Sequence, residues 1–336
     1  MKKTVCIASI LVLVLFSSCG GDTGPAAEAL PTPPAEAAAT PAPEATPTPA
    51  PEAPAAETRA RPAIDREGYA ITLPDEINTI VTIGPSNTEV LSALGFAGQI
   101  VSTDRHSYNV PGIAEDIAVL DMMALDAEFL IELNPDIIFI TGMTRVHGDG
   151  DPLSQVSDAG ITVVFMPSSI SIGAIMEDIR FMAAVLDAYE EGEEIISEMQ
   201  AEIDIITEIV STIQATRTVY FEISPAPHLW TVGANTFINE MIELAGGVNV
   251  FGDRDSWVGV ADEIVLEINP EVIITSISFL DDPVDEIINR PGWDAITAVQ
   301  NGDVFQVSTD YTNRPSQNVV RGLRQIAAAI HPDYFN

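Results

Sequence analysis

Aromatic and basic side chains follow several of the predicted strands or lie in the loops between elements. In the first half of the chain they are His106, Tyr108, Arg145 and His147, and in the second half Trp230, Trp257, Tyr311 and Arg314. Aromatic rings offer broad, rigid apolar contact to a macrocycle or aryl group, and arginine donates charge-assisted hydrogen bonds. We therefore expect these side chains to line a ligand-binding cleft.

The histidines leave a second kind of site open. His106, His147 and His228 would suit zinc or manganese if they met beside a carboxylate. None of them lies in an H-x-x-x-H or similar pair. A free zinc or manganese binder is therefore kept as an alternative to a binder of an organic chelate.

Composition and motifs exclude several other classes. The sequence contains no G-x-S-x-G, H-E-x-x-H, Walker or G-x-G-x-x-G motif, and its two cysteines, Cys6 and Cys19, precede the globular region. A formal net charge of -36 repels nucleic acid and gains nothing from anionic lipid. We expect neither an enzyme nor a nucleic-acid binder, and no covalent cofactor.

The first residues have the pattern of an export signal. Lys2 and Lys3 precede an apolar run over residues 5–16, which is too short for a membrane span of about 20 residues. The segment Leu15-Phe16-Ser17-Ser18-Cys19-Gly20 resembles a bacterial lipobox. This resemblance implies a signal peptide over residues 1–18 and a lipidated Cys19; the alternative is an ordinary cleaved signal with a chance cysteine.

A tether is predicted to follow the lipidation site. Residues 25–57 consist mostly of Pro, Ala, Thr and Glu, a composition that buries no core and favours a disordered or polyproline-like chain. We assign residues 19–70 to this tether. A long tether behind a lipid anchor favours the outer face of a Gram-positive-type cell membrane.

From about residue 71 onward, short β-branched runs alternate with amphipathic stretches. This pattern predicts βαβ units with parallel strands that are buried on both faces. A long helix over residues 189–215 separates an N-terminal lobe, 71–188, from a C-terminal lobe, 216–336. The predicted strands are Thr79–Ile83, Gln99–Thr103, Ile137–Thr141, Thr162–Met166, Thr218–Ile223, Val272–Thr275 and Val304–Val307.

An internal repeat supports the two lobes. Residues 126–138 return as 261–273 at an offset of 135, each copy reading as a short helix, an Asn-Pro break and a buried strand. The fold class that follows is α/β, with two Rossmann-like lobes joined by a single long helix and a ligand cleft between them. A separate S-x-x-E pattern at Ser86 and Glu89 predicts a helix capping box.

Several segments together carry a resemblance to a known family. They include Ile83-Gly84-Pro85-Ser86-Asn87-Thr88-Glu89, Leu133-Asn134-Pro135-Asp136, Gly233-Ala234-Asn235-Thr236-Phe237 and Leu244-Ala245-Gly246-Gly247-Val248-Asn249. Residues 77–336 resemble the helical-backbone (class III) substrate-binding proteins of ABC transporters, which bind ferric siderophores, haem and cobalamin. The resemblance implies a metal-chelate ligand, and an ABC permease dimer with ATPase subunits as partner. The low arginine count favours a nearly neutral corrinoid.

The resemblance also assigns roles to single residues. It places Asn87 at the border of the cleft and gives Trp257 and Tyr311 the best-supported places in it. Glu128 and Glu263, 135 residues apart, match the family's glutamates that pair with permease arginines. An acid in a first helical turn also favours the helix dipole, by about 0.3–1 kcal/mol, so a purely structural role stays open. Glu132 and Glu267 repeat at the same offset, and the sequence does not exclude them as the docking pair.

The sequence thus predicts a monomeric, lipid-anchored, extracytoplasmic binding protein of an ABC importer. Its ligand would be cobalamin or another corrinoid, a ferric siderophore or haem. A free zinc or manganese binder and a surface sensor without a transport role are the alternatives.

Overall fold

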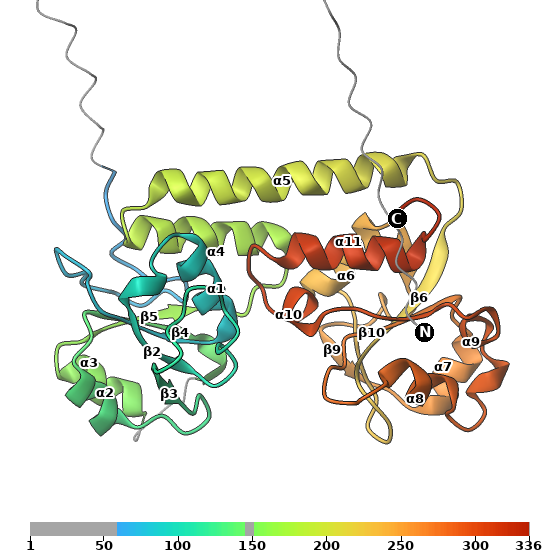
Figure 1. The fold of residues 1–336 in the computed structure, drawn as a ribbon, viewed down its shortest axis with the longest axis horizontal. Helices are drawn as coiled ribbons and strands as arrows, with labels where there is room; N and C mark the ends of the chain where they lie inside the picture. The colour runs from blue at the N-terminus through green and yellow to red at the C-terminus, as the bar shows by residue number, and fades with distance from the viewer. Residues whose placement is uncertain (1–58, 145–150, 336) are drawn as a thin grey trace, which may run out of the picture. The chain divides into compact units, whose positions relative to one another are not determined.

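The computed structural model of the chain describes residues 59–144 and 151–335. The predicted signal peptide, Cys19 and residues 19–58 of the tether lie outside the described residues, as do Arg145 and His147. The described residues belong to one compact unit, Thr58–Asn336, in which two α/β lobes are joined by a long helix (Figure 1).

The first lobe is built on a parallel five-stranded sheet in the order β3-β2-β1-β4-β5. The three central strands are almost wholly buried, as strands covered by helices on both faces should be. The strands are β1 (Ile80–Ile83), β2 (Ile100–Asp104), β3 (Ala118–Leu120), β4 (Ile137–Thr141) and β5 (Thr162–Met166). The helices are α1 (Pro85–Ala93), η1 (Ala97–Gln99), α2 (Ala127–Leu133), η2 (Gly142–Thr144), α3 (Pro152–Asp158) and α4 (Ile172–Val185).

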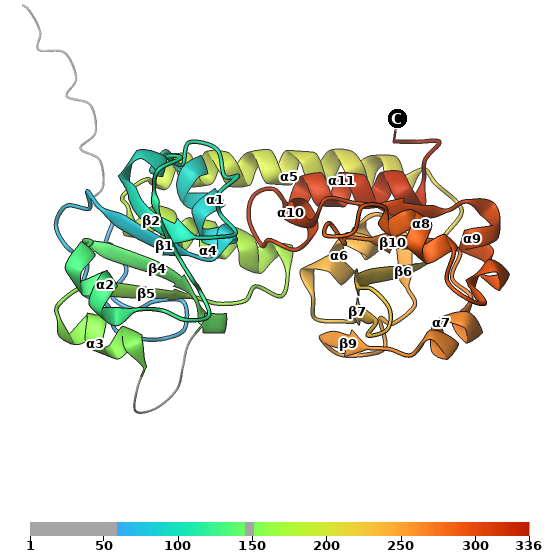
Figure 2. The ribbon, with the colours of Figure 1, turned by 60° about the horizontal axis from the view of Figure 1, so that its bottom comes forward.

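The predicted spacer helix is α5 (Tyr189–Ser211), which ends a few residues before the predicted boundary. Its buried stripe, Ile196, Met199, Ile203 and Ile206, belongs to one hydrophobic cluster that contains side chains of both lobes. Two views show α4 and α11 (Val319–Ile330) packed along α5, one from each lobe (Figures 1 and 2). The helix therefore joins the lobes through a continuous core.

The second lobe contains a six-stranded mixed sheet in the order β11-β10-β6-β7-β9, with β8 paired to β6. The expectation of a purely parallel sheet is wrong here, because residues 225–229 between β6 and β7 are too few for a crossover and give an antiparallel pair. The strands are β6 (Arg217–Ser224), β7 (Trp230–Val232), β8 (Gly247–Asn249), β9 (Trp257–Gly259), β10 (Val272–Thr275) and β11 (Val304–Gln306). The remaining helices are α6 (Phe237–Leu244), α7 (Asp262–Ile268), α8 (Pro283–Ile288), η3 (Trp293–Ala295), α9 (Thr297–Asn301) and α10 (Thr309–Thr312).

The sequence repeat is a repeat of local structure. Both α2 and α7 end on an asparagine in the left-handed conformation, at Asn134 and Asn269, followed by a buried proline. In the first lobe, the carboxylate of Asp136 accepts hydrogen bonds from the backbone N–H (2.8 Å) and the hydroxyl (2.9 Å) of Thr79. In the second, Glu271 accepts the same pair from Thr218, at 2.8 and 3.0 Å. Each acid ties the start of a central strand to the strand beside it.

The predicted capping box at Ser86 and Glu89 is wrong. The N-cap of α1 is Gly84, with φ 104°, and no side chain caps the helix. Pro85 occupies the first turn, where its missing N–H costs nothing. Glu89 is free to point elsewhere, and its carboxylate contacts the second lobe.

Residues 59–71 form an ordered N-terminal strap on the first lobe, so the predicted tether boundary at residue 70 lies too late. Ile64 and Ala70 form an antiparallel bridge, and the strap's Asp65 is buried. No helix in residues 59–144 and 151–335 is long and apolar enough to cross a membrane.

Candidate functional site

A cavity of about 450 Å³ lies between the two lobes, and we call it the Trp257 cavity. The first lobe contributes the segments that follow β1 and β5, the last residue of β4, Thr141, and Met122. Carboxyl ends of parallel strands are the usual place for ligands in open α/β sheets. The lining residues are Gly84, Pro85, Ser86, Asn87, Met122, Thr141, Pro167, Ser168, Ser169, Ile170, Asn235, Thr236, Phe237, Ser256, Trp257, Asn313, Arg314 and Pro315.

Three of the predicted ligand residues, Asn87, Trp257 and Arg314, line this cavity. Trp257 begins β9 and is 45% exposed, so its ring is available for contact. Asn87 is buried, and its amide nitrogen donates to the Ile83 carbonyl at 3.0 Å. This bond fixes the turn between β1 and α1. Asn87 therefore helps to shape the cavity wall through a hydrogen bond within its own lobe.

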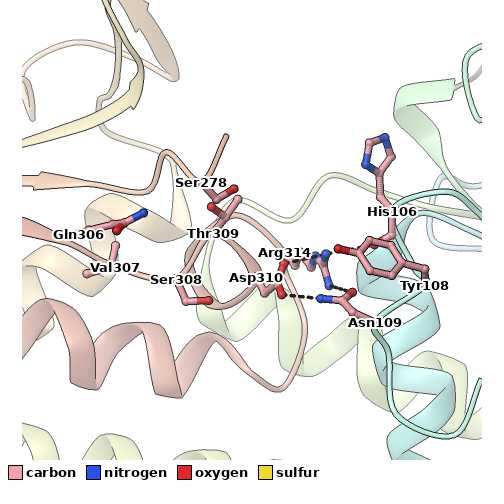
Figure 3. Close-up of a pocket in the computed structure, with 10 residues that line it drawn as sticks. All are labelled: His106, Tyr108, Asn109, Ser278, Gln306, Val307, Ser308, Thr309, Asp310 and Arg314. Atoms are coloured by element: carbon pink, nitrogen blue, oxygen red, sulfur yellow. Dashed lines mark hydrogen bonds and ion pairs between the residues drawn. The ribbon is translucent and has the colours of Figure 1, made fainter. Parts of the chain in front are cut away.

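A second, more polar cavity of about 620 Å³ opens beside the first, and we call it the Tyr108 cavity. Figure 3 shows His106, Tyr108 and Asn109 of the first lobe on one side, and Ser308, Thr309 and Asp310 of the second on the other. The predicted residues His106 and Tyr108 are thus brought to the lobe junction, and Tyr108 is 78% exposed. Arg314 lines both cavities.

Arg314 bridges the lobes between the two cavities. Its guanidinium lies 2.8 Å from the carboxylate of Glu89 on α1 and 2.7 Å from that of Asp310 on α10. It also donates to the His106 carbonyl at 3.1 Å. Two carboxylates therefore already balance the charge of the arginine that sequence reasoning assigned to the ligand.

Two other predicted residues line neither of these cavities, although Tyr311 lines a third cavity, of about 530 Å³, that shares Arg314 with both. Among the described residues, Trp230 and Tyr311 line neither the Trp257 nor the Tyr108 cavity. Tyr311 lies under the guanidinium of Arg321, 5.5 Å from ring centroid to the guanidinium carbon. Arg145 and His147 lie outside the described residues.

Sequence reasoning missed Phe237 and Ile170 as lining residues. Phe237 is the first residue of α6, where the hydroxyl of the preceding Thr236 caps the helix by accepting from Asn239 N at 3.2 Å. Ile170 is exposed and lies in the loop between β5 and α4. The strand was predicted to end at Met166, and segments that follow parallel strands commonly border the ligand site. This rule could have identified Ile170 as a lining residue.

The Trp257 cavity has little charge. Among its described lining residues Arg314 alone is charged, and no aspartate, glutamate or histidine contributes. In residues 59–144 and 151–335, no group of three or more His, Cys, Asp or Glu side chains could hold a metal ion. The wall therefore suits an uncharged, partly apolar organic surface better than a bare cation.

The two matched glutamates lie on exposed helix starts. Glu128 is in the first turn of α2 and Glu263 in the first turn of α7, and both side chains are exposed. Figure 1 shows α2 and α7 in different lobes, both on the side away from α5. Asp126 caps α2 by accepting from Glu128 N at 2.9 Å, so the Glu128 carboxylate is not needed as the cap.

Known proteins with similar sequences and folds agree with this architecture. An uncharacterised ABC transporter substrate-binding lipoprotein of Bacillus subtilis, YvrC, is 28% identical over 274 residues, covering 81% of this chain and 85% of its own. A cobalamin-binding protein of Halobacterium salinarum is 25% identical over 276 residues, covering 80% and 73%. The crystal structure of a possible iron-binding (periplasmic solute-binding) protein from Staphylococcus epidermidis superposes with a TM-score of 0.67 at 26% identity, over 76% of this chain and all of that one.

The family assignment rests on a longer match. The family profile described as "Periplasmic binding protein" matches residues 80–311, which contain all of the sheets and most of both cavities. The chain belongs to the periplasmic binding protein family and has the two-lobed fold of its substrate-binding members.

Proposed function

We propose that this substrate-binding protein captures a nearly neutral metal chelate, a corrinoid such as cobalamin in the first place, and delivers it to an ABC importer. The observation that carries the ligand class is the wall of the Trp257 cavity. It combines Trp257, Phe237 and Ile170 with hydroxyl and amide groups, and its one charged described residue is already paired.

Electrostatics favours a ligand of low charge. Arg314 is paired with the carboxylates of Glu89 and Asp310, which neutralise its charge. Its electrostatic attraction for a polyanionic catecholate siderophore is therefore weak. A net charge of -36 also repels anions approaching the protein. A corrinoid, with a broad apolar ring system edged by amides, meets neither obstacle.

The relatives support the transport role and the ligand class. One is named as an ABC substrate-binding lipoprotein and another as a cobalamin-binding protein. For this chain, the anchor would be a lipidated Cys19 on the extracytoplasmic face, and Glu128 and Glu263 would dock on the permease. Free zinc or manganese binding is less well supported, because the described cavity walls offer no cluster of metal ligands.

A thermal-shift panel tests the ligand. Cobalamin, cobinamide, haem, a ferric hydroxamate and a ferric catecholate are each added to the purified protein, with zinc and manganese chlorides as ions without chelate. We expect the corrinoids to raise the melting temperature, since a ligand at 100 times its Kd stabilises the fold by about 2.7 kcal/mol. Stabilisation by the catecholate or a bare ion, with none from corrinoids, would reject the proposed ligand class.

A further inference from the structure

The N-terminal strap covers the outer edge of the first sheet. Strand β5 is the last in the order β3-β2-β1-β4-β5, and an uncovered edge leaves backbone N–H groups without partners. Asp65 of the strap is 6% exposed, and its carboxylate accepts from Phe165 N of β5 at 3.1 Å. The ring of Tyr69 packs against that of Phe165 at a centroid distance of 5.7 Å. The strap thus holds the end of β5, just before the cavity wall begins.

A second contact runs from the strap to the wall itself. Arg66 Nε donates to Asp178 Oδ1 on α4 at 2.6 Å, and the other oxygen of Asp178 accepts from the hydroxyl of Ser169. Asp178 and Ser169 are both about nine-tenths buried. Ser169 belongs to the segment 167–170, all four residues of which line the Trp257 cavity. Arg66 therefore reaches the cavity wall through one carboxylate.

Two further contacts fix the strap in place. The guanidinium of Arg61 binds the carbonyls of Val185, at the end of α4, and Pro74 at 2.7–3.0 Å through its Nε and Nη1 atoms. The carboxylate of Glu67 lies over Gly142, where a Cβ would come within 1.8 Å of Glu67 Oε1. Gly142 directly follows Thr141, another lining residue. The strap accordingly touches the ends of both strands that form this side of the cavity.

We propose that Arg66 is a positioning residue for ligand binding, which holds residues 167–170 in the wall of the Trp257 cavity through Asp178 and Ser169. The strap then belongs to the binding apparatus, although it precedes the family match at residues 80–311. When this wall segment is already ordered in the ligand-free protein, less conformational entropy is lost on binding, and the affinity is higher. The choice of cobalamin as probe rests on the proposed function.

The test compares Arg66→Ala with Arg180→Ala in the otherwise intact protein. Arg180 is the control, because it is an arginine of α4 whose ion pairs, with Glu177 on the same helix and Glu193 on α5, are exposed and do not involve the cavity wall. We expect Arg66→Ala to weaken cobalamin binding about tenfold in calorimetry and to speed hydrogen exchange of the backbone amides within 165–170 (Pro167 has none) in the ligand-free protein. Arg180→Ala should change neither, and Arg66→Lys should recover part of both.

The two readouts separate the possible failures. Unchanged exchange at 165–170 in Arg66→Ala overturns the proposal, and so does faster exchange with an unchanged Kd. If the wild type binds no corrinoid, the proposed ligand fails, and the exchange measurement still decides whether Arg66 holds the wall. Asp178→Asn, which keeps the side-chain shape, replaces Arg66→Ala if the latter does not fold, with the same expected changes.

Discussion

The carboxylate of Glu89 and the guanidinium of Arg314 lie 2.8 Å apart across the lobe junction, although 225 residues separate them in the chain. Both are largely buried, and Glu89 also accepts from the hydroxyl of Ser316 and from Asn318 Nδ2. Since Arg314 lines both cavities, this contact joins the lobes at the wall of the site. The carboxylate of Glu89 thus ties α1 of the first lobe to the second lobe, in addition to the core along α5.

Removing this carboxylate should destabilise the protein. Glu89→Ala leaves Arg314, Ser316 and Asn318 without their common acceptor, and breaking a buried pair costs about 3 kcal/mol. Urea unfolding at pH 7, followed by circular dichroism, measures the loss. Glu177→Ala is the control, because its exposed pair with Arg180 should contribute no more than about 0.5 kcal/mol. Equal midpoints for Glu89→Ala and the wild type would contradict a role in holding the lobes.

The Glu89 contact also marks the limit of what the sequence could predict. Buried strands such as Ile137–Thr141 and Val272–Thr275 have the predicted bounds, because continuous β-branched runs indicate burial locally. The S-x-x-E spacing at Ser86 predicted a local partner for Glu89, whereas the real partners come from the other lobe. Spacing along a chain reports neighbours on one element and carries no signal for a contact 225 residues away.

The same reasoning explains the other differences. The antiparallel β7 and β9 are three residues long, too short for a periodic signal. The sequence analysis included most of the strap in the tether because the strap has no periodic apolar pattern. Single polar contacts, such as that between Asp65 and Phe165 N, hold it on the first lobe, and such contacts leave no signal in the sequence. The family resemblance favoured Trp257 over Trp230 in the cleft, and Trp257 alone of the two lines the cavity.

Reversing the charge of both matched glutamates should stop uptake without weakening ligand binding. In Glu128→Arg with Glu263→Arg, cation would meet cation if the permease presents arginines to these exposed helix starts. We expect uptake of labelled cobalamin by whole cells to fall to background. The Kd of the purified protein should stay within about twofold, because neither glutamate lines the Trp257 or the Tyr108 cavity.

The neighbouring pair Glu132 and Glu267 supplies the matched control. These residues occupy the same two helices, are also exposed and are related by the same repeat. Their double reversal changes the net charge by the same amount but leaves Glu128 and Glu263 in place. It should therefore leave most of the uptake intact. Uptake that survives the first double variant, or is lost equally in both, would reject docking through Glu128 and Glu263.

His331 should make the protein less stable in mild acid. Burial lowers the pKa of His331, with Arg217 adding to the effect, and its Nε2 has no hydrogen-bond partner among the described residues. The unfolded chain therefore takes up a proton at a higher pH than the folded one, so this residue's contribution is present above its unfolded pKa of about 6.5 and is lost as pH falls below it. His331→Gln should lose less free energy of unfolding than the wild type between pH 7.5 and 5.

Urea unfolding at the two pH values gives this difference, and His228→Gln controls for it because His228 is exposed. The comparison is made between variants, since burial raises the pKa of Asp178 and Glu222, and such carboxyls favour the folded state as pH falls. A His331→Gln protein with the same pH dependence as the wild type would contradict this prediction, because it would mean that the imidazole has the same pKa in the folded and unfolded states.

Trp257 should contribute more to ligand binding than any other aromatic side chain of the lobe junction. It lines the interlobe cavity next to Phe237, and its 45% exposed ring leaves a broad apolar face for a corrin. Truncating a central tryptophan costs about 2 kcal/mol in a typical interface, so Trp257→Ala should raise the Kd for cobalamin roughly 30-fold.

Trp230→Ala is the control, because Trp230 is 44% exposed on the neighbouring strand and lines neither cavity. Calorimetric Kd values that rise equally in both variants would place the ligand across β7 as well and restore Trp230 to the site; a rise in Trp230→Ala alone would place the ligand outside the Trp257 cavity.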